Sequence, residues 1–316
     1  MRATPSRRQF VKGTGAALGG VLAGGSAAAQ AQVLPSSPGR RFRGLVSGVE
    51  PVLAPGAHDV MTARMIEEAG FPALVVGGSA CSAVMHGVPD VGLVSITELI
   101  DYSGNIARSV DIPVMADADD GGGTPINVYR AVHQFGKAGV AAVMIEDTYQ
   151  AKHLGPGEEL LPVEAFVDKV TAAAEAGVAS ELVVIARTDA LSVGLSMDEA
   201  LARGVAYAEA GADMLYLSGL RLEDCPRAAD ALQRPLMQTV SNVPLEEIRR
   251  NRVSLAVYAG QLLSVAMGAS YRALQEIRST GVISGYQERT LPAGVQGRLN
   301  RQAEVAERAR RYHVTG

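Results

Sequence analysis

Short apolar runs alternate with helical patterns along most of the chain, and this alternation constrains the fold more than any other feature. The runs recur at a spacing of roughly 30 residues, and each is typical of a buried parallel strand. The predicted strands are 52–57, 73–77, 113–117, 142–146, 182–187, 214–217, 235–239 and 255–259. Strands that alternate with helices form a parallel sheet, and eight such units close into a (βα)8 TIM barrel. An open doubly wound sheet is the alternative, but no GxGxxG pattern follows the first strand.

Helix start signals support the same alternation. Ser95 and Ser196 each precede a helical pattern, and Glu98 and Glu199 follow three residues later, which is the spacing of a capping box. The helices predicted between the strands include 60–69, 96–109, 126–138, 163–176, 197–210 and 245–251. The chain is therefore α/β in class, with extra helices after the last strand.

The first 31 residues predict a twin-arginine signal peptide. Arg7 and Arg8, followed by Phe10 and Lys12, precede an apolar run rich in glycine and alanine and a small-x-small pattern at 29–31. We expect cleavage rather than a membrane anchor, because the run is too short to span a bilayer comfortably. Residues 32–44 are then predicted to be a disordered linker and 45–316 the catalytic domain, located in the periplasm.

The charge balance argues against two classes of partner. The leader holds four of the 29 basic residues and none of the 33 acids, so the mature chain has a net charge of 25 minus 33, or −8. An acidic protein of this kind is not expected to bind nucleic acid, or a membrane once the leader is removed. Its two cysteines, Cys81 and Cys225, form neither a disulfide framework nor a zinc motif.

Acidic residues gather at the C-terminal ends of the third and fourth predicted strands. Asp117 and Asp119 lie on the same side of the chain because strand side chains alternate, and Glu146 ends the neighbouring strand. Asp90 lies in a loop that could reach the same rim. Oxygen ligands beside a glycine-rich turn favour Mg2+, or Mn2+, over zinc. The alternative for Asp117 and Asp119 is a solvated turn with an aspartate helix cap.

Groups suited to anions follow other strands at the same rim. Arg187 offers a planar fork for a carboxylate, and the amides of Gly77, Gly78 and Ser79 offer an anion-binding turn. Because all these groups meet at one end of a barrel, the predicted ligand is a small carboxylic acid that also chelates a divalent metal.

These motifs resemble the isocitrate lyase and phosphoenolpyruvate mutase superfamily over nearly the whole mature chain. The carrying stretches are Pro55-Gly-Ala-His-Asp59, Gly77-Gly-Ser79, Gly87-Val-Pro-Asp90, Asp117-Ala-Asp-Asp-Gly-Gly-Gly123, Ile145-Glu-Asp147 and Ala186-Arg-Thr-Asp189. The resemblance implies a (βα)8 barrel that forms homodimers or homotetramers, often by exchanging the last barrel helix.

The resemblance also implies roles for individual residues. Mg2+ would lie near Asp119, with Asp117, Glu146 and Asp90 acting directly or through water. Arg187 and the turn from Gly77 to Ser79 would bind the carboxylate ends of the substrate. Asp90, Asp119 and Arg187 are thus the predicted catalytic residues.

The oxaloacetate decarboxylase-like branch of the superfamily is the most similar. The carbon–carbon lyases carry a cysteine where Leu154 stands and a glutamate where Ser218 stands, and the decarboxylase-like branch has a histidine near Gln261. The resemblance implies a Mg2+-dependent lyase that acts on a small 2-oxo acid through an enolate that the metal stabilises. It also implies that Gln261 contacts the substrate. The alternatives are a methylisocitrate lyase-type or phosphonopyruvate/phosphoenolpyruvate mutase-type enzyme and a non-catalytic periplasmic dicarboxylate-binding protein.

Overall fold

Eight parallel strands form the centre of the molecule. The computed structural model describes residues 36–149, 152–153 and 159–314, so the predicted leader and the start of the predicted linker lie outside the described residues. The strands are β1 (Val52–Pro55), β2 (Leu74–Val76), β3 (Val114–Asp117), β4 (Ala142–Glu146), β5 (Val183–Thr188), β6 (Met214–Leu217), β7 (Met237–Thr239) and β8 (Leu255–Tyr258). Each lies within the predicted range or one residue beyond it.

The strands close into a barrel. They form two parallel sheets, with the orders β1-β8-β7 and β2-β3-β4-β5-β6. Parallel bridges between Gly56 and Val75 and between Leu215 and Leu236 join the two sheets at both seams. Every strand thus neighbours the next one in sequence, and the predicted (βα)8 barrel is confirmed.

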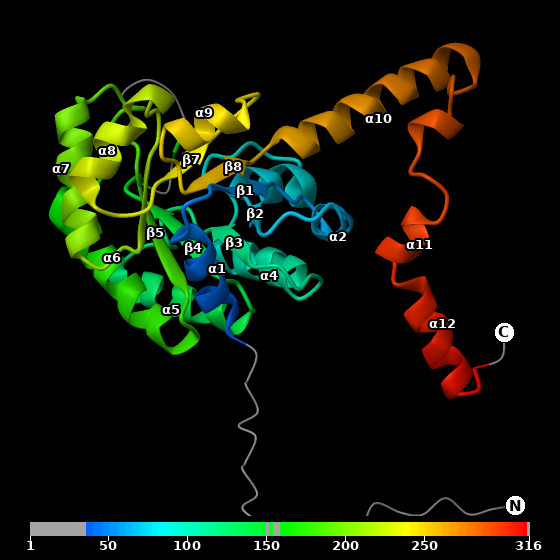
Figure 1. Cartoon of the computed structure of the whole chain (residues 1–316), viewed down its shortest axis with the longest axis horizontal. Helices are drawn as coiled ribbons and strands as arrows, with labels where there is room; N and C mark the ends of the chain where they lie inside the picture. The colour runs from blue at the N-terminus through cyan, green and yellow to red at the C-terminus, as the bar shows by residue number, and fades with distance from the viewer. Residues whose placement is uncertain (1–35, 150–151, 154–158, 315–316) are drawn as a thin grey trace, which may run out of the picture. The chain divides into compact units, whose positions relative to one another are not determined.

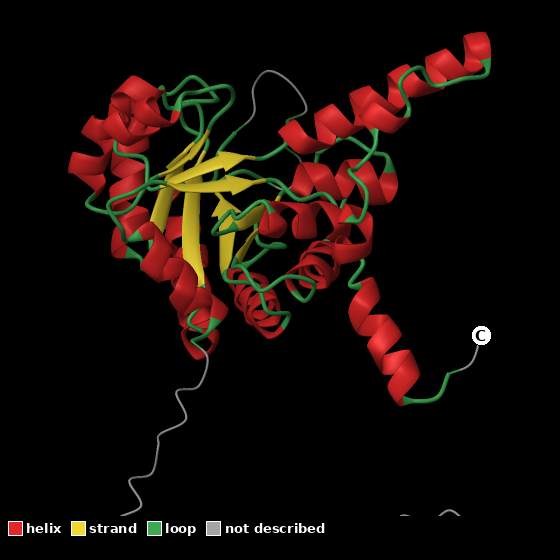
Figure 2. Cartoon of the chain, turned by 45° about the vertical axis from the view of Figure 1, so that its right-hand side comes forward, coloured by secondary structure: helices red, strands yellow, loops and turns green. Residues whose placement is uncertain are grey.

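Helices surround the barrel (Figures 1 and 2). The helices between strands are α2 (Val60–Glu68), α4 (Ile96–Ala107), α5 (Pro125–Lys137), α6 (Val163–Gly177), α7 (Met197–Glu209), α8 (Cys225–Leu232) and α9 (Leu245–Arg250), and a short α3 (Gly78–Cys81) runs into a π-helical turn, Ser82–His86. Among the described residues, no helix is both long and apolar enough to cross a membrane.

The two predicted helix caps have different outcomes. Ser95 and Glu98 form the full capping box at the start of α4. Ser196 caps α7 by accepting the backbone N–H of Glu199, but the Glu199 carboxylate binds Arg203 Nε at 3.0 Å instead of turning back to the cap. An arginine one turn along the helix therefore competes for that carboxylate.

The predicted linker is wrong over its second half. Residues 38–46 form the helix α1 (Pro38–Val46), which Ser37 caps. Phe42 and Val46, one turn apart, are buried and belong to the same apolar cluster as the inward-facing residues of the barrel. Contacts with Glu181 and Asp213, which lie just before β5 and β6, place α1 at the N-terminal end of the strands. The helix forms because it closes the bottom of the barrel.

Truncating Phe42 should therefore destabilise the protein strongly. The Phe42 side chain is fully buried, and removal of such a ring by Phe42→Ala typically costs about 3–5 kcal/mol of unfolding free energy. Chemical denaturation of residues 32–316 measures this loss, with Lys137→Ala, at an exposed position of α5, as a control. A change below about 1 kcal/mol, the level expected of a surface substitution, would show that α1 is not part of the fold.

The last helices differ from the rest. The helix α10 (Gln261–Thr280) has no buried residue, and it extends away from the barrel (Figure 1). Its apolar side chains Val265, Tyr271 and Leu274 are exposed. The helix α11 (Val295–Leu299) returns to α2, where Arg64 Nη1 donates to Leu299 O at 2.7 Å, and α12 (Gln302–Arg311) follows it.

Candidate active site

The alternation of side chains along the strands brings three predicted site residues into the barrel mouth. Met115, Met144 and Ile185 point into the barrel interior and belong to its inner apolar cluster. Two residues later on the same strands come Asp117, Glu146 and Arg187. Because side chains two apart share a face, these three residues also point inward, at the C-terminal ends of β3, β4 and β5.

Asp117 and Asp119 lie against the start of α3. Asp117 accepts backbone N–H groups from Gly78 at 3.2 Å and from Asp119 at 3.1 Å. Asp119 has a φ of 48°, in the left-handed region that few residues other than glycine adopt. A Cβ at position 78 would lie 2.8 Å from Asp119 Oδ1 and 3.5 Å from Asp117 Oδ2. A side chain at position 78 would therefore crowd the Asp119 carboxylate, and the two carboxylates approach the same point.

A lysine that was not predicted to be in the site lies among these acids. Lys152 Nζ lies 2.8 Å from Asp119 Oδ1, 3.1 Å from Glu146 Oε1 and 3.7 Å from Asp90 Oδ1, and its side chain is 1 % exposed. The residues expected around a metal ion thus surround an ammonium group. The composition of its loop gave no indication that Lys152 would turn inward.

Arg187 is held by two carboxylates. Its Nε and Nη2 bind Asp189 at 2.7 and 2.8 Å, and its Nη1 lies 2.9 Å from Glu146 Oε2. The guanidinium also lies over the ring of Tyr216, 5.6 Å from the centroid. Glu146 Oε1 accepts a hydrogen bond from Thr148. The planar fork of Arg187 is therefore fixed in orientation.

Negative charge is in excess at this rim. Asp90, Asp117, Asp119 and Glu146 face two cations, Lys152 and Arg187. Burial, followed by the neighbouring Asp117, raises the pKa of Asp119 to about 7. The surrounding acids hold the pKa of Lys152 above its usual range despite burial, so it stays charged. A divalent cation would neutralise the remaining charge.

The residue types fit a hard cation such as Mg2+, although the arrangement is not a ready-made cage. Among the described residues, no three acidic, histidine or cysteine side chains converge on one ion. Asp117 and Asp119 nevertheless offer carboxylate oxygens that approach a common point beside Gly78. The ammonium of Lys152 contacts the same Asp119 oxygen, so it would have to give up this contact to a metal.

The other predicted substrate-binding residues lie at the same end of the barrel. Gly77 and Gly78 begin α3, and Ser79 is exposed. Gln261 begins α10, where its Nε2 donates to Val240 O at 2.7 Å, and its buried Oε1 has no hydrogen-bond partner among the described residues. The Ser218 hydroxyl lies 2.9 Å from that of Ser192. Leu154 lies outside the described residues. The roles of all these residues stay predictions.

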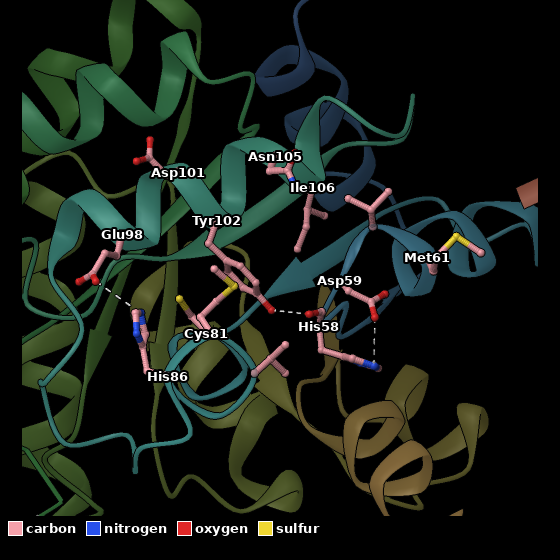
Figure 3. A pocket seen from close by; sticks show the side chains of 13 residues that line it. His58, Asp59, Met61, Cys81, His86, Glu98, Asp101, Tyr102, Asn105 and Ile106 are labelled. Atoms are coloured by element: carbon pink, nitrogen blue, oxygen red, sulfur yellow. Dashed lines mark hydrogen bonds and ion pairs between the residues drawn. The ribbon is translucent and has the colours of Figure 1, made fainter. Parts of the chain in front are cut away.

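A separate cavity of about 620 Å3 lies beside the mouth, and the acids of the rim do not line it. Figure 3 shows this cavity from close by. It lies between α2, α3 and α4 and includes His58, Cys81, His86 and Tyr102. Tyr102 donates its hydroxyl to His58 O at 2.6 Å, which ties α4 to the end of β1. Burial raises the pKa of the Cys81 thiol to about 11. Cys81 is therefore a packed thiol and not a thiolate nucleophile at neutral pH.

Comparison with known proteins now identifies the family. The family described as phosphoenolpyruvate phosphomutase (PEP mutase) matches residues 42–278, which covers all eight strands. The chain belongs to the PEP mutase family. The resemblance predicted from the motifs is therefore confirmed.

Individual members of this family are similar over different lengths. The chain is 34 % identical to an oxaloacetate decarboxylase from Bradyrhizobium, over 87 % of this chain and 96 % of that enzyme. It is 42 % identical to the 2,3-dimethylmalate lyase of Eubacterium barkeri, over 56 % of this chain and 62 % of that enzyme.

A solved structure of another member of the superfamily has the same fold. The complex of a phosphonopyruvate hydrolase with oxalate and Mg2+ superposes with a TM-score of 0.79 at 27 % identity, covering 88 % of this chain and 99 % of that one. Together these relatives confirm the predicted barrel and an enzyme of the lyase and mutase superfamily.

Proposed function

We propose that this PEP mutase family member is a Mg2+-dependent carboxy-lyase for a small 2-oxo acid, with oxaloacetate as the first candidate. One observation carries the proposal: two kinds of group lie at the same rim of the barrel. Asp117 and Asp119 suit a cation, and the guanidinium of Arg187, which is fixed in orientation, suits a carboxylate. Oxaloacetate combines a chelating 2-oxo carboxylate with a second carboxylate, so it matches both parts. The similarity to an oxaloacetate decarboxylase supports the same substrate.

Each side chain has a role in this mechanism. Asp117 and Asp119 would hold Mg2+, which when bound supplies Lewis-acid stabilisation for the negative charge that develops on the keto oxygen. Arg187 would bind a substrate carboxylate, and Asp189 fixes its fork. The buried ammonium of Lys152 adds fixed positive charge to the same region.

Decarboxylation requires little acid–base catalysis from the protein. The bond to the departing carboxylate breaks, CO2 leaves, and the bonding electrons remain on the substrate as an enolate. One proton then adds to carbon and gives pyruvate. Because no base is needed for the cleavage, Ser218 in place of a glutamate is compatible with it. The acids around Lys152 hold its pKa high, so it keeps its proton, and we assign the proton donor to water.

A second candidate is cleavage of a hydroxy dicarboxylate into two acids, which the 42 % identity to 2,3-dimethylmalate lyase favours. This reaction needs a base for the hydroxyl proton. Ser218 at the end of β6 lies beside Ser192 and is a poor base. Phosphonopyruvate chemistry and dicarboxylate binding without turnover have less support.

Two further parts of the proposal concern assembly and location. The exposed apolar side chains of α10 suit burial against a second copy, so we propose a homodimer or homotetramer. The N-terminal residues carry the twin-arginine pattern, so we propose export to the periplasm. Light scattering of the mature protein and fractionation of cells expressing the full chain test these two statements.

A substrate panel separates the candidate reactions. The mature protein with Mg2+ is offered oxaloacetate, 2-methylisocitrate, 2,3-dimethylmalate and phosphonopyruvate, and the 2-oxo acid or phosphate released is measured for each. We expect turnover of oxaloacetate to exceed that of the others. Preferred cleavage of either hydroxy acid would overturn the carboxy-lyase assignment, and tight binding of oxaloacetate without product would favour a binding protein.

A further inference from the structure

A fully buried aspartate lies directly behind the candidate active site. Asp147, the residue after β4, is 0 % exposed. Its Oδ2 accepts hydrogen bonds from Thr188 Oγ1 at 2.7 Å, from Tyr207 OH at 2.8 Å and from Arg203 Nη1 at 3.1 Å. Its Oδ1 accepts the backbone N–H of Asp189 at 3.0 Å. A buried carboxylate with this many donors holds all of their positions together.

One side of this network leads to Arg187. Thr188 and Asp189 directly follow Arg187 in the chain, and the Asp189 carboxylate accepts two hydrogen bonds from Arg187. The backbone N–H of Asp147 also donates to Arg187 O at 3.2 Å. The direction of the Arg187 fork therefore depends on where Asp147 holds the backbone at 188–189.

The other side leads to α7, on the outside of the barrel. Arg203 and Tyr207 are one turn apart on that helix, and Arg203 Nη1 lies 3.2 Å from Tyr207 OH. Arg203 also donates to Leu161 O at 3.0 Å, and Leu161 N donates to Asp147 O at 2.8 Å. The ring of Tyr207 packs edge-on against Phe166 of α6 with centroids 4.6 Å apart. Neither Arg203 nor Tyr207 contacts the acids of the barrel mouth, which are Asp90, Asp117, Asp119 and Glu146.

We propose that Arg203 and Tyr207 are positioning residues that act through Asp147 to orient Arg187 for the substrate carboxylate. This role rests on the proposed function, because it gives Arg187 a ligand to bind. The outward-facing helix α7 thereby contributes to affinity for the acid, and not only to the stability of the barrel. The hydrogen bonds of Tyr207 and Arg203 belong to one network, so their effects should be less than additive when combined.

Tyr207→Phe is the first test, because it removes one hydrogen bond and keeps the ring. Oxalate is the probe, and its affinity in Mg2+ is measured by calorimetry. We expect the dissociation constant to rise about fivefold to tenfold, which is less than direct loss of a hydrogen bond to a charged group would cause, because Tyr207 acts on Arg187 only through Asp147. Arg203→Lys, whose ammonium can still donate to Asp147, should retain more affinity than Arg203→Met. The matched control is Arg227→Met, which removes an exposed pair to Asp198 of α7.

Hydrogen exchange supplies a readout that does not depend on the substrate. In Tyr207→Phe, the backbone amides of Asp189 and Leu161 should exchange faster, while amides in β1 and β8 stay unchanged. A variant that binds oxalate as the wild type does, with only a lower melting temperature, would overturn the proposal. If the wild type itself fails to bind oxalate, the proposed function is wrong. Unchanged exchange at Asp189 would then overturn the positioning role as well, and local acceleration there would support it.

Discussion

Asp119→Asn should lower metal-dependent turnover about a thousandfold while leaving the barrel folded. Asparagine keeps the shape of the side chain but removes the charge that approaches Asp117 beside Gly78. We expect the affinity for Mg2+ to fall at least about a hundredfold, since even groups one shell away from a metal commonly affect affinity tenfold to a hundredfold. The rate constant kcat should fall about a thousandfold, because charge development on the substrate loses its electrostatic stabilisation.

Calorimetry with Mg2+ alone and kinetics with oxaloacetate measure the two effects separately. Asp230→Asn is the matched control, because it removes an exposed carboxylate that pairs with Arg252 on the surface. The metal assignment is wrong if Asp119→Asn binds Mg2+ and turns over substrate as the control does. Loss of turnover with unchanged Mg2+ binding would instead place the cation elsewhere and make Asp119 a partner of Lys152.

Arg187→Lys should have the second large effect, and it should appear mainly in substrate binding. Lysine keeps the positive charge near Glu146 but cannot reproduce the paired hydrogen bonds to Asp189 or present a planar fork. We expect KM for oxaloacetate and the dissociation constant of oxalate to rise about tenfold to a hundredfold, which corresponds to loss of one or two charge-assisted hydrogen bonds.

Lysine is preferable to an apolar residue in this test. Arg187→Met would remove the ion-pair partner of the buried Asp189 carboxylate and one of the two cations beside Glu146, and breaking a buried ion pair in this way costs about 3–5 kcal/mol of stability. Arg249→Lys, at an exposed pair with Glu50, controls for the exchange itself. An unchanged KM in Arg187→Lys together with a lower kcat would assign Arg187 to the reaction step rather than to binding.

The rim of the barrel was predictable from sequence because strand geometry is regular. Once 113–117, 142–146 and 182–187 are strands of a parallel barrel, their C-terminal ends must meet, and alternation decides which side chains point inward. Glu146 and Arg187 are also direct neighbours in the register of β4 and β5. This pairing explains why the two side chains form an ion pair, and the pattern of apolar residues alone does not specify it.

The features that the sequence did not predict depend on tertiary contacts. The segment before β1 has the proline, glycine and arginine content of a linker, and α1 forms because Phe42 closes the barrel floor. Lys152 itself lies outside any helix or strand, so no periodicity orients its side chain. Nothing in the sequence distinguishes Arg203 and Tyr207 from other residues of a helix, yet they bind Asp147, which lies 56 and 60 positions earlier in the chain.

Pyruvate formation from oxaloacetate by the mature protein is the most direct test of the central claim. The rate is measured with Mg2+, after subtraction of the rate with Mg2+ alone, and again with EDTA. The account predicts protein-dependent pyruvate formation that EDTA abolishes and added Mg2+ restores. A folded, Mg2+-bound protein that leaves oxaloacetate intact, or one that decarboxylates it equally well in EDTA, would contradict the account.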